Sequence, residues 1–186
     1  MRNVLLVLSG PSGVGKGTIV NKLLEAGDYA LSISCTTRAP REGEVDGREY
    51  FFKTRDEFLS LAENGGLLEY SAHFDNYYGT PKKFVEEQLK RRDVILEIEV
   101  DGALQVKKAY PAAILIMIAP PSVEELRRRL IGRGTECVEK IEKRIERMDY
   151  ELSKAPKYDY TVVNDDLNSA VKEICDIILK EKSKND

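Results

Sequence analysis

The clearest chemistry in this sequence lies in the stretch Ser9-Gly10-Pro11-Ser12-Gly13-Val14-Gly15-Lys16-Gly17-Thr18. Its glycines at positions 10, 13 and 15 let the backbone turn tightly, with its N–H groups pointing inward. A helix that starts directly after this turn adds a partial positive charge, so the turn can hold phosphate oxygens. From there the ammonium group of Lys16 can reach the outer phosphates of a bound nucleotide. The stretch predicts a phosphate-binding loop.

The residue after the lysine departs from the general form of such loops. That form has Ser or Thr there to approach Mg²⁺, whereas this chain has Gly17 and places the hydroxyl of Thr18 one residue later. The Gly-Lys-Gly-Thr order resembles nucleoside monophosphate kinases, in which phosphate oxygens and water hold most of the magnesium. We therefore expect Mg²⁺ to enter with ATP, and Thr18 to approach it only through water.

Arginines gather in a second region, at positions 127, 128, 129, 133, 144 and 147. The two glycines that flank Arg133 allow this segment to hinge. Arginines on a segment that closes over phosphates neutralise charge and remove water, and phosphoryl transfer depends mainly on positioning and charge neutralisation. We favour this role for Arg133. For Arg127, Arg128 and Arg147 the sequence favours a solvated helix face with Glu–Arg pairs.

A polar region between positions 34 and 80 contains the residues for a second phosphate site. Arg38 and Arg41 lie close together, and Tyr50 and Tyr78 follow. Two guanidinium groups and two phenol hydroxyls can clamp one phosphate through charge-assisted hydrogen bonds. Taken singly, each tyrosine is equally consistent with a half-buried residue of a sheet.

Glu69 occupies a predicted strand directly after two leucines. Its carboxylate is either an exposed strand residue or an acceptor for N–H donors of a ligand. Guanine presents two adjacent donors, N1–H and the N2 amine, which one carboxylate can accept together, and adenine presents no such pair. On the residues alone, the exposed-strand interpretation is the stronger one.

Three acids, Glu97, Glu99 and Asp101, stand at the end of an apolar run. They resemble a Walker B position, where an acid meets Mg²⁺ or its waters. In open α/β sheets the carboxyl ends of the strands face the ligand crevice. We therefore expect at least one of the three to be functional, with Glu97 and Glu99 as candidates for magnesium through water.

Apolar runs and helical periodicity predict the elements that position these residues. Buried strands are expected at 4–8, 94–100, 112–118 and 160–163, and helices at about 15–26, 81–91 and 103–109, from Ser122 and from Leu167. The region 34–80 should contain a strand at 49–53, a helix at 56–63, a strand at 67–72 and a turn at 76–80, with 34–47 too polar for the core. A later helix carries one apolar face, made of Ile141, Ile145, Met148 and Leu152.

This pattern predicts an α/β fold, a parallel-sheet core flanked by helices with two excursions. The 186 residues suit one domain spanning 1–186. Its core should comprise about 1–33, 81–125 and 150–186. An inserted lobe should span about 34–80, and a helical lid about 126–149.

Composition excludes several other classes of protein. A net charge of -3 gives no general reason to expect binding to nucleic acid or to a membrane, and no apolar run approaches the roughly 20 residues of a membrane span. Three scattered cysteines and the single His73 argue against a structural zinc site or a disulfide framework. A core strand near the start leaves no room for a signal peptide. We expect a reduced, cytoplasmic protein in which Cys35 is a small packed residue.

Six segments in order make the chain similar to the guanylate kinase family: Gly10-Pro11-Ser12-Gly13-Val14-Gly15-Lys16, Ser34-Cys35-Thr36-Thr37-Arg38-Ala39-Pro40-Arg41-Glu42-Gly43-Glu44, Asn76-Tyr77-Tyr78-Gly79-Thr80, Ile118-Ala119-Pro120-Pro121-Ser122, Gly132-Arg133-Gly134-Thr135 and Val163-Asn164-Asp165-Asp166-Leu167. The resemblance implies a P-loop core with a GMP-binding lobe and a lid. It also implies the reaction ATP + GMP ⇌ ADP + GDP with Mg²⁺, with ATP and GMP as partners. We expect a monomer or homodimer.

The resemblance implies a role for individual residues as well. It assigns the ATP phosphates to Gly10, Pro11, Ser12, Gly13, Val14, Gly15, Lys16, Gly17 and Thr18. It assigns the lid to Arg133 and Arg144, with Arg129 as a further candidate, and places Asn164 near the ATP base. The GMP phosphate falls to Arg38, Arg41, Tyr50 and Tyr78, and guanine to Ser34, Glu69 and Thr80. Catalytic roles fall to Lys16, Arg38, Arg133 and Arg144.

The acidic strand departs from the family pattern at two positions. Glu99 replaces the usual Asp and Asp101 the usual Gln, which leaves the contact of Glu99 with GMP or metal open. Two other functions also stay open: a guanylate-kinase-like module that binds proteins, and a small-molecule kinase with another acceptor. A signalling GTPase is disfavoured because the chain has no Asn-Lys-x-Asp motif.

Overall fold

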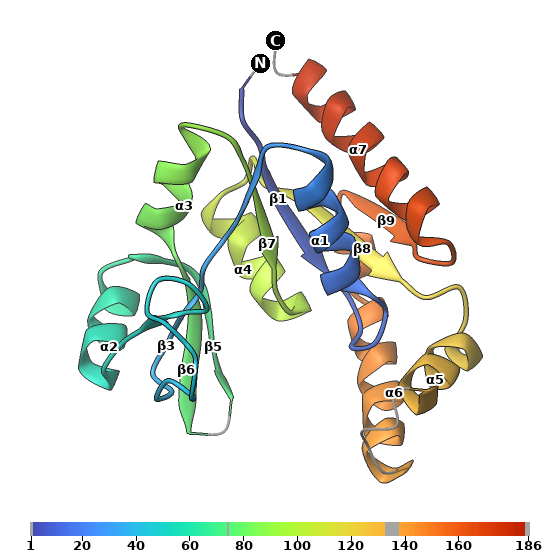
Figure 1. Ribbon diagram of the computed structural model, residues 1–186, viewed down its shortest axis with the longest axis horizontal. Helices are drawn as coiled ribbons and strands as arrows, with labels where there is room; N and C mark the ends of the chain where they lie inside the picture. The colour runs from blue at the N-terminus through green and yellow to red at the C-terminus, as the bar shows by residue number, and fades with distance from the viewer. Residues whose placement is uncertain (1, 74, 133–137, 185–186) are drawn as a thin grey trace.

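Five parallel strands form the central sheet in the computed structural model, which describes residues 2–73, 75–132 and 138–184 (Figure 1). Every neighbouring pair in the sheet is parallel. Residues 5–8 and 114–119 of the inner strands are buried apolar runs, as expected where helices cover both faces of a sheet. In spatial order the strands are β2 (Tyr29–Leu31), β7 (Asp93–Glu97), β1 (Leu5–Ser9), β8 (Ile114–Ala119) and β9 (Tyr160–Val163).

Alternate residues of each strand face opposite sides of the sheet, and a separate core lies on each side. Leu6 and Leu8 pack against α1 (Lys16–Ala26) and α7 (Leu167–Ser183). Leu5 and Val7 of β1 pack with α3 (Lys82–Leu89) and α4 (Val100–Ala109) on the other face. This arrangement confirms the predicted α/β fold with a parallel sheet.

A second sheet of four strands lies beside the core, at the lower left of Figure 1. Its order is β4 (Phe51–Phe52), β3 (Cys35–Thr36), β6 (Asn76–Pro81) and β5 (Leu67–His73), and α2 (Arg55–Glu63) packs with it. The pairs that β6 makes with β3 and β5 are antiparallel, whereas β3 and β4 are parallel. The predicted excursion at 34–80 is therefore a small sheet with one helix.

Two predictions for this second sheet were wrong. The range 76–80, expected to be a turn, is strand β6, because its backbone pairs with strands on both sides. The segment 34–47 was expected to be too polar for the core, yet Cys35 and Thr36 are fully buried. The Thr36 hydroxyl donates to the carbonyl of Tyr77 at 2.9 Å, which offsets the cost of burying it.

Helices α5 (Val123–Gly132) and α6 (Val138–Leu152) form the other excursion, at the lower right of Figure 1. They enclose a small core of their own, built from Leu126, Leu130, Ile141, Ile145 and Met148, with Leu152 packed against it. The predicted apolar face of the later helix is confirmed. A 3₁₀ turn, η1 (Ala155–Lys157), then leads into β9.

The strand that carries the acidic residues was predicted at 94–100, which is too long. It ends at Glu97, and Glu99 in extended conformation caps the start of α4 instead of continuing the strand. Val100 begins the helix and is buried, so the chain must turn at this point to place it in the core. The turn leaves the side chains of Glu97, Glu99 and Asp101 at the carboxyl edge of the central sheet.

Across the three described ranges, no helix has both the length and the apolar character of a membrane span.

Candidate active site

The loop between β1 and α1 can only be built with glycine at two of its positions. A Cβ on Gly10 would lie 2.2 Å from the carbonyl oxygen of Ile118, and the backbone there has a φ of +144°. A Cβ on Gly15 would lie 2.6 Å from the side-chain amide nitrogen of Asn164, at a φ of +96°. Both φ values lie in the region that favours glycine. The loop therefore closes tightly onto β8 and the segment that follows β9.

Lys16, the first residue of α1, folds back over this loop. Its ammonium group donates to the carbonyl of Gly10 at 2.5 Å and to that of Pro11 at 3.1 Å. Partial enclosure raises the pKa of the nearby Glu97 carboxyl, and the positive charge of Lys16 opposes that shift. An ammonium group held over this loop, at the start of a helix, is suited to bind the oxygens of a polyphosphate.

Two cavities open at the carboxyl edge of the central sheet. The loop cavity, of about 680 Å³, is lined by Gly10, Ser12 and Lys16 together with Lys143, Arg144 and Glu151 of α6. The lobe cavity, of about 410 Å³, is lined by Ser34 and by residues of the second sheet that include Glu69, His73 and Tyr78. Five of the described residues line both cavities and form a shared wall: Tyr50, Glu97, Ile98, Glu99 and Arg147. Ligands in the two cavities would therefore meet at this wall.

Glu69 is a buried carboxylate in the lobe cavity, not an exposed strand residue. It is only 7% exposed, and its Oε1 accepts a hydrogen bond from the hydroxyl of Thr80 at 2.7 Å. Burial raises the pKa of the Glu69 carboxyl above its ordinary value. A carboxylate held this way in a cavity is suited to accept N–H donors from a ligand, which corrects the exposed-strand interpretation.

Gly102 makes room for this carboxylate, which the sequence did not indicate. A Cβ on Gly102 would lie 2.8 Å from Glu69 Oε2. Gly102→Ala should therefore displace the carboxylate and weaken ligand binding in the lobe cavity. We expect roughly tenfold weaker binding of a guanine nucleotide there, about 1.4 kcal/mol, with ATP binding unchanged. Titration calorimetry with each nucleotide measures both, and an equal loss for the two would contradict the expected local effect.

The predicted phosphate clamp is partly assembled. The rings of Tyr50 and Tyr78 lie 6.0 Å apart, and the guanidinium of Arg38 lies 5.5 Å from the Tyr50 ring. Both terminal nitrogens of Arg38 bind Glu44, at 3.0 and 2.9 Å, and this hydrogen bonding raises the pKa of Arg38 and lowers that of Glu44. Arg41 is exposed, and its backbone N–H donates to Glu44 at 2.7 Å. Neither arginine is among the residues that line the two cavities.

Of the three arginines assigned to the lid, the structure describes Arg144 and Arg129, which make different contacts. Arg144 on α6 lines the loop cavity and bonds to the hydroxyl of Ser12 in the phosphate loop. Arg129 donates to Glu125 at 2.8 Å and to the backbone carbonyl of Asn164 at 2.9 Å. Arg133 lies outside the described residues, so its predicted role is not addressed by the structure.

Asn164 braces the phosphate loop. It is buried, and its side-chain amide donates to the carbonyl of Val14 at 2.8 Å, against the face of Gly15 that lacks a Cβ. The sequence predicted a place near the ATP base. The structure adds a loop contact that depends on the neighbouring strands β8 and β9.

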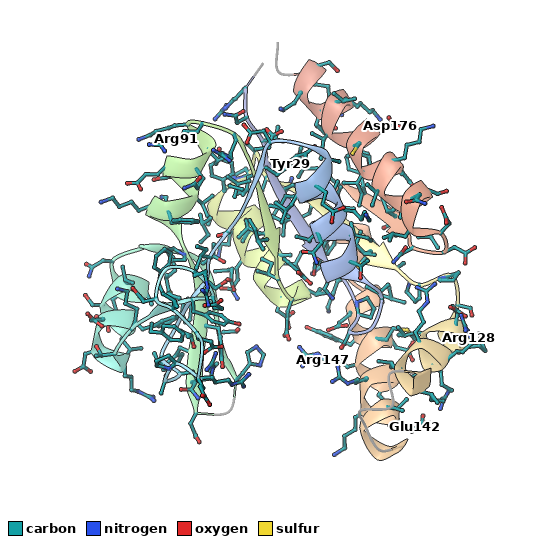
Figure 2. All side chains as sticks on the ribbon, in the orientation of Figure 1. Tyr29, Arg91, Arg128, Glu142, Arg147 and Asp176 are labelled. Carbon is teal, nitrogen blue, oxygen red and sulfur yellow. The ribbon has the colours of Figure 1, made fainter. Side chains whose placement is uncertain are left out.

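For Arg147 the sequence favoured a solvated helix face with Glu–Arg pairs, and the structure agrees in part. The side chain is exposed and pairs with Glu151, but it also faces the two cavities. Arg147 bonds to Glu99 at 2.5 Å and to Glu151 at 3.1 Å. Figure 2 shows Arg147 on the side of α6 that faces the gap toward the second sheet, whereas Arg128 lies on the outside of α5. The spacing from Arg144 could have indicated this, since residues three apart share a helix face.

The donor set at the shared wall suits magnesium in part. Carboxylate oxygens are the ligands that Mg²⁺ prefers, and it usually keeps several waters beside one or two carboxylates. Glu97 lies against Gly17, with both carboxylate oxygens 3.8 Å from where a Cβ there would be. Among the described residues, no group of three or more His, Cys, Asp or Glu side chains could hold a metal ion by itself. The site therefore fits an ion that phosphate oxygens complete.

Cys35 lies under the lobe cavity and is chemically protected. Its thiol is fully buried, contacts the carbonyl of Gly79 at 3.4 Å, and burial raises its pKa to about 11. At pH 8 this pKa leaves about a hundredfold less thiolate than the ordinary value of 9.0, and only the thiolate reacts. We expect iodoacetamide to alkylate Cys35 at least a hundredfold more slowly in the folded protein than in urea. Peptide mass spectrometry measures this, and equal rates would contradict the burial.

Comparisons with known proteins identify the family. The sequence model of the family described as guanylate kinase matches residues 2–181. A guanylate kinase of Caldanaerobacter subterraneus subsp. tengcongensis is 50% identical over 187 residues, covering 100% of this chain and 91% of the relative. One from Streptococcus thermophilus is 50% identical over 183 residues, covering 97% and 88%. The crystal structure of guanylate kinase from Anaplasma phagocytophilum matches with a TM-score of 0.72 and 37% identity, covering 97% of this chain and 86% of that one. The chain belongs to the guanylate kinase family.

Proposed function

We propose that this protein transfers the γ-phosphoryl group of ATP to GMP, giving ADP and GDP, and that it also accepts dGMP. The observation that carries the proposal is the wall shared by the loop cavity and the lobe cavity. A triphosphate on the phosphate loop and a monophosphate in the lobe cavity would meet there. Membership of the guanylate kinase family supports this assignment of substrates.

The donor nucleotide would bind along the phosphate loop. Backbone N–H groups of the loop residues other than Pro11, and the ammonium group of Lys16, would hold its phosphates. Arg144 would contribute a guanidinium from α6, since it lines the loop cavity. Arg129 and Asn164 would support the far side of the donor site, because they hold each other and the loop. We propose the same donor role for Arg133.

The acceptor would bind in the lobe cavity. Glu69, held by Thr80, would accept the N1–H and N2 donors of guanine, with Ser34 and Glu99 on the same cavity surface. The acceptor phosphate would bind Tyr50 and Tyr78, with Arg38 and Arg41 as the cationic partners. For that contact the phosphate would replace Glu44 as the partner of Arg38, exchanging one bidentate anion for another.

The reaction needs little more than positioning and charge neutralisation. An oxygen of the acceptor phosphate attacks the γ-phosphorus in line, and the bond to the leaving oxygen of ADP breaks. The attacking oxygen is already anionic, so no general base and no covalent intermediate are required. Lys16, Arg144 and Arg133 would stabilise the charge that develops between the nucleotides. Glu97, Glu99 and Thr18 would approach Mg²⁺ bound with ATP through water, and the ion would supply further charge neutralisation for the transfer.

The two excursions would exclude water during transfer. We propose that residues 34–80 act as a GMP-binding lobe and 126–149 as a lid over a core of 1–33, 81–125 and 150–186. Closure of both would protect ATP from wasteful hydrolysis. We further propose a cytoplasmic monomer or homodimer that binds neither nucleic acid nor membrane, consistent with the net charge of -3.

The test is ADP release measured with a panel of acceptors: GMP, dGMP, AMP, CMP and UMP, each with and without Mg²⁺. The proposal expects turnover with GMP and dGMP only, and its loss without the metal. Preference for another acceptor would identify a different small-molecule kinase. Absence of turnover with all five would instead favour a protein-binding module and overturn the proposal.

A further inference from the structure

Two side chains at the start of α4 both bond to α6. Glu99 accepts a hydrogen bond from Arg147 at 2.5 Å, and Asp101 accepts one from the hydroxyl of Tyr150 at 2.8 Å. Arg147 and Tyr150 are three residues apart, so they lie on the same face of α6. These are the two positions at which the acidic strand departs from the family pattern. The contacts dock α6 against the carboxyl edge of the central sheet.

The guanidinium of Arg147 is held by two carboxylates. Its Nη2 donates to Glu99, and its Nε donates to Glu151, one turn further along α6 and itself buried. A guanidinium has five N–H donors in a rigid planar fork. Within the part of the chain that the structure describes, these are the only hydrogen bonds of Arg147. The remaining N–H donors of the fork are therefore available where Arg147 lines the cavities.

The position of Arg147 is unusual because it belongs to both cavities. Among the described residues of the shared wall, Arg147 is the cationic one, and Glu97 and Glu99 are anionic. Lys16 and Arg144 line only the loop cavity. Phosphates that meet at the wall would face two carboxylates, and Arg147 supplies a positive charge at that place.

We infer that Arg147 is a further phosphate-binding residue, aimed by Glu99 and Glu151 at the point where the donor and acceptor phosphates meet. Glu99 then acts as a positioning residue for this guanidinium. The inference rests on the proposed function and deepens it. Because the contact forms between the two nucleotides, it should contribute more to transfer than to the binding of either nucleotide alone.

The first test compares Arg147→Met with Arg128→Met. Arg128 is also an arginine of the second excursion, but among the described residues it bonds only to Glu125, on the outside of α5. We expect Arg147→Met to lower kcat for GMP phosphorylation by roughly 10- to 100-fold. This is less than the roughly 10²- to 10³-fold typical of losing one charge-stabilising donor, because Glu99 and Glu151 already pair with this guanidinium. The Michaelis constants for ATP and GMP should change less than about threefold, and Arg128→Met should leave all three values within about twofold.

A binding measurement tests directly whether Arg147 contacts phosphates at the shared wall, without relying on turnover. The probe is a dinucleoside pentaphosphate that joins adenosine to guanosine, whose phosphate chain crosses the shared wall. Arg147→Met should weaken its binding about tenfold or more and that of GMP alone less than about twofold. Equal losses for the two ligands, or a kcat within twofold of the unchanged protein, would overturn the inference. If the unchanged protein fails to phosphorylate GMP at all, the proposed function itself is wrong.

Two further variants distinguish phosphate binding by Arg147 from a structural role in docking α6 against the central sheet. Tyr150→Phe removes the second docking bond without altering the shared wall, so a merely structural role predicts equal losses in Tyr150→Phe and Arg147→Met. Our inference predicts a kcat near normal for Tyr150→Phe. Glu99→Gln should lower kcat about three- to fivefold alone and not at all in the Arg147→Met background. Additive effects would show that Glu99 acts independently of Arg147. Thermal unfolding of each variant checks that it folds.

Discussion

Lys16→Ala is expected to lower kcat by roughly 10²–10³-fold or more, while the affinity for GMP changes little. The ammonium group lies over the phosphate loop and bonds to the carbonyls of Gly10 and Pro11. There it would neutralise charge that grows on the donor phosphates as transfer proceeds, and losing one such donor typically costs about 2.7–4 kcal/mol of transition-state stabilisation. Steady-state kinetics with both substrates measure kcat, and calorimetry measures GMP binding.

Lys22→Ala provides the matched control for this variant. Lys22 is on the same helix, and its exposed ammonium group pairs with Glu25 at 2.8 Å. We expect its kcat to stay within about twofold, since an exposed ion pair contributes little. Lys16→Met, which keeps the length of the side chain, should reproduce the loss in Lys16→Ala. Turnover of Lys16→Ala equal to that of Lys22→Ala would rule out the assigned role.

Glu69→Gln is expected to raise the Michaelis constant for GMP about a hundredfold and that for ATP less than twofold. The carboxylate has Thr80 on one oxygen and Gly102 against the other, so its orientation in the lobe cavity is fixed. A glutamine presents one oxygen and one NH₂ group there, and the NH₂ group would meet the N–H donors of guanine. Losing a hydrogen bond to a charged group and leaving donors unpaired costs about 3 kcal/mol, close to a hundredfold.

The control for this variant is Glu63→Gln, at the exposed end of α2 in the same lobe. It should leave both Michaelis constants unchanged. A similar loss for ATP and GMP in Glu69→Gln would contradict recognition of the base by this carboxylate. Titration of both variants with GMP and with ATP distinguishes the outcomes.

The raised pKa of Glu69 also predicts a dependence on pH. Because burial disfavours the charged form, the carboxyl takes up a proton at a higher pH than the ordinary value of 4.5. Protonation removes an acceptor for guanine. The GMP affinity of the unchanged protein should therefore decrease as the pH is lowered, and it should decrease more than the GMP affinity of Glu69→Gln. The same group favours folding below pH 4.5 and disfavours it as pH rises through the raised value. Glu69→Gln should therefore unfold at an equal or higher temperature at pH 7, and a large decrease would contradict this.

The sequence by itself determined the elements with strong local patterns. The phosphate loop, the buried strands β1 and β8 and the apolar face of α6 follow from glycine spacing and from hydrophobic periodicity. These signals come from residues near one another in the chain, so they do not depend on which strands become neighbours. Strand β6 was misread as a turn because its pairing partners, β3 and β5, supply its backbone hydrogen bonds.

Only the tertiary structure decided which charged residues meet. Arg147 and Glu99 are 48 positions apart, and Asn164 and Val14 are 150 positions apart, yet both pairs are hydrogen-bonded. Such contacts arise because parallel strands joined by helices bring distant segments to one edge of the sheet. Local spacing places Arg144 and Arg147 on one face of α6, but it does not specify which edge that face meets or which carboxylate is buried there. The parallel order of the strands determines which charged side chains meet, because it brings residues that are far apart in the sequence to the same edge of the sheet.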